Sequence, residues 1–338
     1  MAVRVGINGF GRIGRLTLRN ILSRHVGGIE VVAVNDLTDS KTNAHLFKWD
    51  SNYGPFQGEV TTDANDVIVD GKKIKVFAER NPGDIRWDTE GVDVVIESTG
   101  LFTNATKAVA HREHGVKKII ISAPAKEEDL TIVLGVNESA YDPAKHHVLS
   151  NASCTTNGLA PIAKVLNDRF GIEKGLLTTV HAYTSSQKVQ DTAAKDDLRD
   201  ARAAAQNIVP SSTGAARAVG LVIPELVGKF SGMAFRVPTP TVSVVDFTAL
   251  LSKDASIGDI NAAVKEYADG PMKGIVEYCD LPLVSTDMKG NSHSSIFSAV
   301  DTIAVGGNLV KVVAWYDNEW GYACRVGDLV KYIADRGL

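Results

Sequence analysis

The stretch that decides the fold is Val3-Arg4-Val5-Gly6-Ile7-Asn8-Gly9-Phe10-Gly11-Arg12-Ile13-Gly14. Its first half is an apolar strand, and its G-x-G-x-x-G opens a helix with one apolar side. A second apolar strand, residues 30–35, follows and is succeeded by Asp36. This order of strand, glycine-rich turn, helix, strand and acidic residue is typical of a βαβ unit that binds a dinucleotide.

Each part of this unit suits that ligand chemically. Gly9 and Gly11 let the backbone turn sharply and approach a pyrophosphate, and the helix N-terminus offers unpaired N–H groups to the anion. Asp36 can accept hydrogen bonds from the adenosine ribose hydroxyls and would repel a 2′-phosphate. The competing interpretation is a glycine-rich turn that serves packing alone, and the flanking strands and acidic residue make it the weaker one.

Further apolar strands continue the pattern through the first half of the chain. We predict them at residues 92–96, 118–121 and 132–136, with a helix at 105–114. Nearly continuous apolar strands that alternate with helices indicate a parallel sheet covered on both faces. The first domain is therefore predicted to be a doubly wound Rossmann domain of the α/β class.

The pattern changes after about residue 150. A helix is predicted over residues 154–170, followed by longer strands at 175–184, 242–252 and 308–315 with wide loops between them. This spacing indicates a second, α+β domain with a mixed or antiparallel sheet. Residues 320–338 form an amphipathic pattern typical of a final helix.

The bulk composition narrows the classes of function. The chain has 338 residues, 44% of them hydrophobic, which suffices for two cores. A formal net charge of −4 without a basic tail gives no reason to expect nucleic acid as a partner. No apolar run approaches the ~18 residues that span a bilayer, so we expect a cytoplasmic protein without a membrane partner. Three widely spaced cysteines suit reduced thiols, and no metal is expected.

The second informative stretch is Ser150-Asn151-Ala152-Ser153-Cys154-Thr155-Thr156-Asn157. Cys154 would lie in the first turn of a helix, where the positive end of the dipole lowers the pKa of a thiol. His181 ends a predicted strand and could act as the base that activates this thiol. The alternatives are a buried structural cysteine and a core histidine, because sequence spacing cannot show that the two side chains meet.

Five motifs, in order along nearly the whole chain, resemble the glyceraldehyde-3-phosphate dehydrogenase family. They are Asn8-Gly9-Phe10-Gly11-Arg12-Ile13-Gly14-Arg15, Ala152-Ser153-Cys154-Thr155-Thr156-Asn157, Ser212-Thr213-Gly214-Ala215-Ala216, Arg236-Val237-Pro238-Thr239-Pro240 and Trp315-Tyr316-Asp317-Asn318-Glu319. The resemblance implies the family's glycolytic reaction, in which glyceraldehyde 3-phosphate and inorganic phosphate give 1,3-bisphosphoglycerate with NAD. It also implies a dinucleotide-binding domain of residues 1–153 and 318–338 and a catalytic domain of residues 154–317.

Matching positions give roles to individual residues. Cys154 would form a thiohemiacetal and then a thioester, with His181 as base. Thr184 and Arg236 would hold the substrate phosphate. The attacking phosphate would lie among Ser153, Thr155, Thr213 and Gly214 with Arg199 nearby, although a solvated surface charge is an almost equal alternative for Arg199. The cofactor would contact Gly9, Gly11, Arg12, Ile13, Asp36, Arg80, Thr99, Ser122 and Asn318. The resemblance further implies a homotetramer in which residues 185–212 pack at a neighbouring subunit.

Three positions depart from the family's pattern. Gly158 stands where a second cysteine commonly follows the nucleophile, so redox behaviour that needs that pair is not expected. Thr192-Ala193 replaces a bulky residue followed by proline, which leaves room for a 2′-phosphate, whereas Asp36 opposes one. We predict NAD preference, with secondary use of NADP left open. Asp200 follows Arg199 where some bacterial members carry a second arginine.

Other functions compete with this interpretation. The nearest are erythrose-4-phosphate dehydrogenase, which would pass its thioester to water, and an NADP-using member of the same family. The stretch 212–216 matches the phosphate-using enzyme better than the first of these. Aspartate-semialdehyde dehydrogenase shares the two-domain plan but not these motifs. A non-catalytic binding protein is a different class, and the presence of both Cys154 and His181 argues against it.

Overall fold

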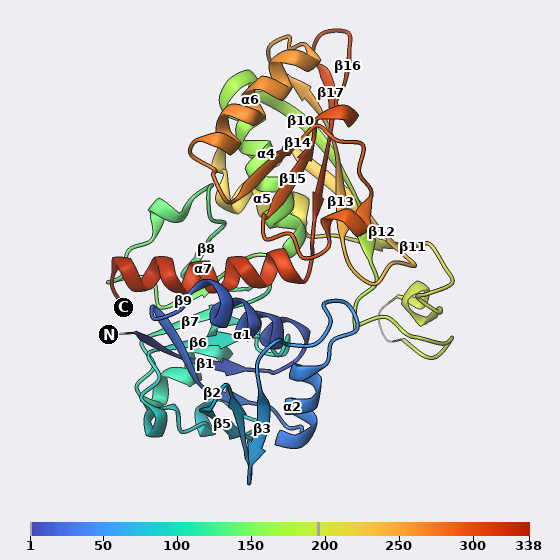
Figure 1. Ribbon diagram of the computed structural model, residues 1–338. Coiled ribbons are helices and arrows are strands. Elements are labelled where there is room, and N and C mark those ends of the chain that lie inside the picture. The colour runs from blue at the N-terminus through green and yellow to red at the C-terminus, as the bar shows by residue number, and fades with distance from the viewer. Residues whose placement is uncertain (1, 195–196) are drawn as a thin grey trace. The chain divides into compact units, whose positions relative to one another are not determined.

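The chain, described here by a computed structural model that covers residues 2–194 and 197–338, forms two compact units (Figure 1). The first comprises residues up to Ile132, Glu138–Ala152 and Ala323–Leu338, and the second comprises Val133–Asn137 and Ser153–Tyr322. The domain limits expected from the sequence differ from these junctions by a few residues and omit the segment Val133–Asn137. The division of the chain at the expected limits into a dinucleotide-binding domain and a catalytic domain stays a prediction.

The first unit is built on a sheet with strand order β3-β4-β5-β2-β1-β6-β7-β9-β8. The strands from β5 to β8 in this order pair in parallel, while β3 and β4 add an antiparallel edge. Its elements are β1 (Val3–Asn8), α1 (Arg12–Arg24), β2 (Ile29–Asn35), α2 (Ser40–Lys48), β3 (Val60–Asp63), β4 (Asp66–Val69), β5 (Lys72–Phe77), β6 (Val94–Glu97), α3 (Ala105–Ala108), β7 (Lys118–Ile121), β8 (Leu130–Thr131) and β9 (Val148–Ser150). The predicted Rossmann domain of the α/β class is confirmed.

The second unit is built on a mixed sheet with strand order β11-β12-β10-β13-β17-β15-β14, to which β16 pairs through β17. Its elements are α4 (Cys154–Phe170), β10 (Ile172–Ala182), β11 (Val209–Ser212), α5 (Ala215–Val222), β12 (Phe230–Val237), β13 (Ser243–Leu251), α6 (Ile257–Asp269), β14 (Val276–Cys279), β15 (Ser295–Ser298), β16 (Ile303–Val305) and β17 (Leu309–Tyr316). Strand β13 alternates buried and half-buried residues, as expected for a sheet covered by α4 on one face. The predicted α+β domain with a mixed sheet is confirmed.

Short 3₁₀ helices join these elements. They are η1 (Pro82–Asp84), η2 (Trp87–Glu90), η3 (Val109–His114) and η4 (Glu138–Ala140) in the first unit and η5 (Leu198–Ala201), η6 (Pro224–Leu226), η7 (Ser285–Met288) and η8 (Ala299–Asp301) in the second. The last helix, α7 (Trp320–Arg336), begins in the second unit and continues in the first, where Arg325 and His25 both pair with Asp328. The predicted final helix is therefore present and ends at Arg336.

Two sequence-based elements differ in the structure. The apolar run 132–136 is buried over its first three residues but is not a strand, because Gly135 has a φ of +83° and the amides of Val136 and Asn137 donate back to the carbonyl of Val133. The helix expected at 105–114 is α for only its first turn and then continues as the 3₁₀ helix η3. Neither segment contains a residue that the sequence analysis assigned to a site.

Candidate active site

The nucleophile candidate stands where the chain enters helix α4. Ser153 caps this helix, since its Oγ accepts a hydrogen bond of 3.0 Å from the Thr156 amide. Immediately before it, Ala152 is buried and has a φ of +54°, a conformation that costs an L-residue free energy and persists only where its surroundings impose it. This sharp turn places Cys154 at the first helical position.

The structure brings Cys154 and His181 together. The Cys154 Sγ lies 3.5 Å from Nε2 of His181, which is buried near the end of β10. A thiol accepts or donates a hydrogen bond at up to about 4 Å because sulfur is large. The pair is therefore placed for proton transfer between the sulfur and the imidazole, the geometry that the sequence could not establish.

The other nitrogen of His181 has two neighbours. Its Nδ1 lies 2.7 Å from the carbonyl oxygen of Ala182 and 2.7 Å from Nη1 of Arg236. The carbonyl can only accept a hydrogen bond and the guanidinium can only donate one, so each tautomer of the imidazole satisfies one of these neighbours. The tautomer with its proton on Nδ1 leaves a lone pair on Nε2 facing Cys154, which is the form that can act as a base.

Arg236 also affects the charge states of this pair. Burial first, and then the Arg236 guanidinium, lower the pKa of His181 to about 4, so its imidazole is neutral at pH 7. Burial raises the pKa of Cys154, against the opposing influence of Arg236 and of the Thr155 amide. The sequence-based expectation of a lowered thiol pKa is thus wrong, because burial of the sulfur outweighs the effect of the helix start.

Tyr316 links the strand of the base to the helix of the nucleophile, and the sequence analysis missed it. Its hydroxyl is 2.8 Å from Oγ1 of Thr155 and 2.9 Å from Oγ1 of Thr179, and its ring meets the His181 ring edge-on at 5.9 Å. Burial raises the pKa of Tyr316, so the phenol stays protonated. Its position inside the motif of residues 315–319 was the only signal in the sequence.

Asn318 is joined to the same end of β10. Its Oδ1 accepts a hydrogen bond of 2.9 Å from the Ser243 hydroxyl, which in turn accepts one of 3.0 Å from the Ala182 amide. Because its carbonyl oxygen is engaged, Asn318 has its amide N–H groups to offer to a ligand.

The remaining phosphate candidates of the second unit differ in their surroundings. Thr213 and Gly214 precede α5, whose start has no side-chain cap, and a Cβ at Gly214 would meet no atom within 4 Å. Thr184 lies just beyond β10, with its hydroxyl 2.9 Å from that of Ser186. Arg199 is exposed and forms a two-point ion pair with Asp197, with Nη2 2.6 Å from Oδ2. In the described residues no contact joins Arg199 to Cys154 or Thr213, which fits the surface-charge alternative.

A cavity of about 350 Å³ in the first unit is lined by five of the dinucleotide candidates, Gly9, Gly11, Asp36, Arg80 and Thr99. Its lining residues are Asn8, Gly9, Gly11, Asn35, Asp36, Leu37, Glu79, Arg80, Ser98, Thr99, Leu101 and Phe102. Gly9 has a φ of +91°, and a Cβ there would come within 2.6 Å of the Thr99 nitrogen, so only glycine fits. A Cβ at Gly11 would instead meet nothing within 4 Å, and no side chain caps the start of α1. Open space beside uncapped helix amides fits a pyrophosphate.

Asp36 lies at the expected edge of this cavity. Its Oδ2 accepts a hydrogen bond of 2.8 Å from the Phe10 amide and its Oδ1 one of 2.9 Å from the Thr38 amide. Each carboxylate oxygen retains a second lone pair, so the group can still accept from ribose hydroxyls. The two amides fix the carboxylate as an acceptor at the end of β2.

Only some of the other cofactor candidates line the cavity. Arg80 and Thr99 line the cavity, whereas Arg12, Ile13 and Ser122 do not. The guanidinium of Arg12 pairs with Asp50 at 2.5 Å. Burial raises the pKa of Asp50, but the hydrogen bonds from Arg12 and from nearby backbone amides outweigh it, so this pKa is lowered overall. Ser122 follows β7 and donates its amide to the carbonyl of Glu97 at 2.9 Å.

Across residues 2–194 and 197–338 there is no group of three or more His, Cys, Asp or Glu side chains that could hold a metal ion. Among the same residues, no helix is long and apolar enough to cross a membrane.

A Rossmann unit with a dinucleotide cavity, combined with a mixed-sheet unit that carries a Cys–His pair, defines a class of two-domain dinucleotide enzymes that act through a cysteine. Comparison with known proteins narrows this class. Residues 3–105 match the family description "Glyceraldehyde 3-phosphate dehydrogenase, NAD binding domain", and residues 153–318 match "Glyceraldehyde 3-phosphate dehydrogenase, C-terminal domain".

Curated relatives match over the whole chain. The glyceraldehyde-3-phosphate dehydrogenase of Geobacillus stearothermophilus is 57% identical over 338 residues, covering 100% of both chains. That of Priestia megaterium and glyceraldehyde-3-phosphate dehydrogenase 1 of Bacillus subtilis are each 56% identical with the same coverage. The chain belongs to the glyceraldehyde-3-phosphate dehydrogenase family.

Proposed function

We propose that the chain is a phosphorylating, NAD-dependent glyceraldehyde-3-phosphate dehydrogenase, which converts glyceraldehyde 3-phosphate and inorganic phosphate to 1,3-bisphosphoglycerate. The observation that carries this proposal is the 3.5 Å approach of Cys154 Sγ to His181 Nε2 at the start of α4. The relatives' names support the substrate, and the match to an NAD-binding domain supports the cofactor.

The proposed chemistry divides into two stages. In the first, the sulfur of Cys154 bonds to the aldehyde carbon and His181 accepts a proton through Nε2, giving a thiohemiacetal and then, on loss of hydride, a thioester. Bound NAD supplies the hydride acceptor. In the second stage, an oxygen of inorganic phosphate attacks the thioester carbon, the C–S bond breaks, and Cys154 leaves as the thiolate, which can take up a proton from His181.

Two groups of residues would hold the anions. Thr184 and Arg236 are proposed to bind the substrate phosphate, which agrees with the position of Arg236 beside His181. The attacking phosphate would be bound by Ser153, Thr155, Thr213 and Gly214, where the uncapped start of α5 offers amide donors. Arg199 would join them only after leaving Asp197, so its role has the weakest support.

The cofactor would be bound mainly by the first unit. The pyrophosphate is proposed to bind beside Gly9, Gly11, Arg12 and Ile13, and the adenosine beside Asp36 and Arg80. The remaining contacts with the cofactor are assigned to Thr99 and Ser122. Asn318 would donate its amide to the nicotinamide carboxamide. Because Asp36 presents a carboxylate at the ribose end, NAD is proposed as the preferred cofactor and NADP as a secondary one.

The proposal extends to assembly and location. A homotetramer is expected, with the segment 185–212 at a neighbouring subunit; Lys195 and Asp196 of this segment lie outside the described residues. A cytoplasmic location is proposed because Cys154, Cys279 and Cys324 are free thiols.

A progress assay tests the activity against its nearest alternative. NADH formation from glyceraldehyde 3-phosphate is followed with and without inorganic phosphate or arsenate, and erythrose 4-phosphate is offered in parallel. The proposal expects sustained turnover of glyceraldehyde 3-phosphate only when phosphate or arsenate is present. Turnover that needs neither anion, or a preference for erythrose 4-phosphate, would overturn it.

A further inference from the structure

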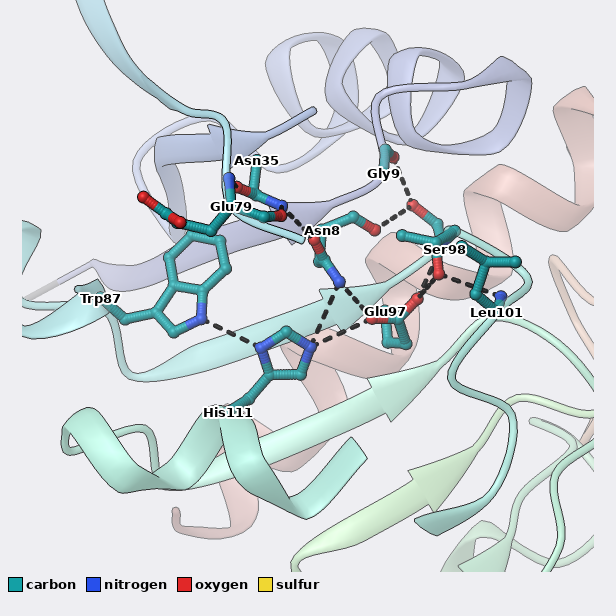
Figure 2. Close-up of polar contacts among 10 residues, drawn as sticks. Asn8, Gly9, Asn35, Glu79, Trp87, Glu97, Ser98, Leu101 and His111 are labelled. Atoms are coloured by element: carbon teal, nitrogen blue, oxygen red, sulfur yellow. Dashed lines mark hydrogen bonds and ion pairs between the residues drawn. The ribbon is translucent and has the colours of Figure 1, made fainter. Parts of the chain in front are cut away.

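A buried polar network lies beneath the dinucleotide cavity and has no part in the proposed chemistry. Its centre is the carboxylate of Glu97, 2% exposed, beside the imidazole of His111, 0% exposed (Figure 2). Burying a carboxylate costs several kcal/mol unless hydrogen bonds compensate it. An apolar residue at position 97 would avoid that cost, so the network calls for a functional explanation.

The sheet topology assembles the network. Asn8, Asn35 and Glu97 end the neighbouring parallel strands β1, β2 and β6, and the strand register pairs Asn8 with both Asn35 and Glu97. The carboxyl ends of parallel strands are the edge at which such sheets bind ligands. Three polar side chains therefore stand in a row below that edge, where the strand pattern alone would favour apolar ones.

The direction of each hydrogen bond can be worked out from His111. The indole Nε1 of Trp87 can only donate, and it lies 3.1 Å from Nδ1 of His111, so Nδ1 must be the acceptor. The neutral imidazole consequently carries its proton on Nε2, which donates to Oε2 of Glu97 at 3.0 Å. Trp87 thereby sets the tautomer of His111, and His111 orients one side of the carboxylate.

Glu97 in turn fixes a wall of the cavity. Its Oε1 accepts hydrogen bonds from the amide of Thr99 at 2.9 Å and from the Thr99 hydroxyl at 2.5 Å. The same hydroxyl accepts a bond of 3.0 Å from the amide of Leu101. Both Thr99 and Leu101 line the dinucleotide cavity. Within the described residues no lysine or arginine pairs with Glu97, whose carboxyl group accepts hydrogen bonds from Thr99, Asn8 and His111.

A second branch reaches the opposite wall. The Asn8 amide donates to Oε2 of Glu97 at 2.5 Å, and the Asn8 carbonyl oxygen accepts from the Asn35 amide at 2.7 Å. Asn35 then makes two bonds with the backbone of Glu79, of 2.8 and 2.9 Å, just before Arg80. Figure 2 shows Glu97 between these two branches, with Glu79 at one end and Leu101 at the other.

We propose that Glu97, oriented by His111, is a positioning residue of the dinucleotide site, which sets the spacing of the two cavity walls and hence the affinity for NAD. The inference rests on the proposed function, since it presumes that this cavity binds NAD. Neither residue touches the catalytic pair, and Glu97 acts through Thr99 and Asn8 rather than on the cofactor itself.

The isosteric variant Glu97→Gln tests this role. A glutamine has nearly the same volume, but its amide group would direct N–H bonds either at the backbone amide of Thr99 or at Asn8 and His111, groups that are donors in this network. One wall must then shift. We expect the Kd for NAD, measured by calorimetric titration of the purified protein, to rise at least tenfold. The KM for glyceraldehyde 3-phosphate at saturating NAD should change less than threefold, a split that a general loss of stability would not produce.

A matched control lies in the same unit. His25 Nε2 and Asp328 Oδ1 form another histidine–carboxylate pair, 2.9 Å apart, between α1 and α7 and away from the cavity lining. His25→Phe should lower the melting temperature without changing the Kd for NAD more than twofold. At position 111, Phe should weaken NAD binding, whereas Gln, which keeps one donor and one acceptor, should recover at least part of the affinity.

The possible results separate the two proposals. If the wild-type chain neither binds NAD nor oxidises glyceraldehyde 3-phosphate, the proposed function fails and this inference fails with it. If the wild type does both but folded Glu97→Gln binds NAD within twofold of it, or no more weakly than His25→Phe, only the inference is overturned. Should Glu97→Gln not fold, His111→Phe decides by the same criterion, since it leaves the carboxylate with its donors Thr99 and Asn8.

Discussion

His181 and Arg236 are register partners on the parallel strands β10 and β12, and their side chains meet with Nδ1 and Nη1 2.7 Å apart. The guanidinium is therefore coupled to His181, and it also favours the thiolate form of Cys154. A single cation thus opposes a positive charge on His181 and supports a negative charge on Cys154. In the proposed function this cation also receives the substrate phosphate, so its surroundings change when substrate binds.

Replacing Arg236 with glutamine should raise the pKa of both members of the pair. The thiolate loses a favourable cation and the imidazolium loses an unfavourable one, so both shifts are upward, by roughly one unit for charges this close. The pH profile of Cys154 alkylation by iodoacetamide should move to higher pH. Arg169→Gln, which removes an exposed arginine paired with Glu266 in the same unit, should leave the profile unchanged. An unshifted profile for Arg236→Gln would contradict the coupling.

Removing the base should separate binding from chemistry. His181→Asn keeps a polar side chain but no group that can accept the proton from Cys154, and general-base loss typically costs 10²–10⁴ in rate. We expect kcat to fall by about that factor while the Kd for NAD changes little, because the cavity lies in the other unit. Stopped-flow measurement of NADH formation checks this. A variant that keeps more than a tenth of the wild-type kcat would show that another group is the base.

Tyr316→Phe should destabilise the second unit and slow the reaction together. The change leaves the buried hydroxyls of Thr155 and Thr179 without their shared partner, which typically costs about 1–3 kcal/mol in the free energy of unfolding. Thr155 adjoins Cys154, and Thr179 lies two residues before His181. Loss of the hydrogen bonds that hold these two threonines should therefore also lower kcat. Urea unfolding and steady-state kinetics measure the two effects. Tyr141→Phe, which loses one hydrogen bond to the Gly337 carbonyl, is the matched control for stability.

The local parts of both sites could be predicted from the sequence. The glycine turn at Gly9 needs a positive φ and the cysteine stretch needs a helix start at Cys154, and each leaves a signature within a few residues. The network around Tyr316 left almost none, because its partners lie 137 and 161 positions away along the chain. The packing of α4 against β17 and the order of the strands β10-β13-β17 in the sheet bring these residues together.

Apolar runs and surface charges were harder to interpret. The run 132–136 has the composition of a buried strand and is buried over its first three residues, yet the left-handed Gly135 turns it into a loop. Hydrophobicity reports burial and not backbone direction, so the two cases look alike in sequence. Likewise, the residue type of Arg199 suits a phosphate ligand, but in the structure its guanidinium forms an ion pair with the nearby Asp197.

Asp36→Asn should weaken the discrimination against NADP. The asparagine keeps the shape and a carbonyl acceptor but removes the negative charge that would face a 2′-phosphate. We expect the ratio of kcat/KM for NADP to that for NAD to rise at least tenfold, equivalent to ~1.4 kcal/mol. Because Asp36 also holds the amides of Phe10 and Thr38, some loss of NAD affinity should accompany the change. An unchanged ratio would mean that the carboxylate does not select the cofactor.

Two glycines of the fingerprint should respond to alanine in opposite ways. At Gly14 a Cβ would lie 2.2 Å from the carbonyl oxygen of Gly9, a backbone atom that cannot move aside, so Gly14→Ala should fold poorly. At Gly11 the φ is −72° and a Cβ would meet no protein atom within 4 Å, so Gly11→Ala should fold with a melting temperature close to that of the wild type.

The methyl group of Gly11→Ala would occupy the space beside the uncapped amides of α1, where the pyrophosphate is proposed to bind. Gly11→Ala should therefore raise the Kd for NAD at least tenfold without a matching loss of stability. If Gly11→Ala binds NAD as tightly as the wild type, the pyrophosphate does not lie at this helix start.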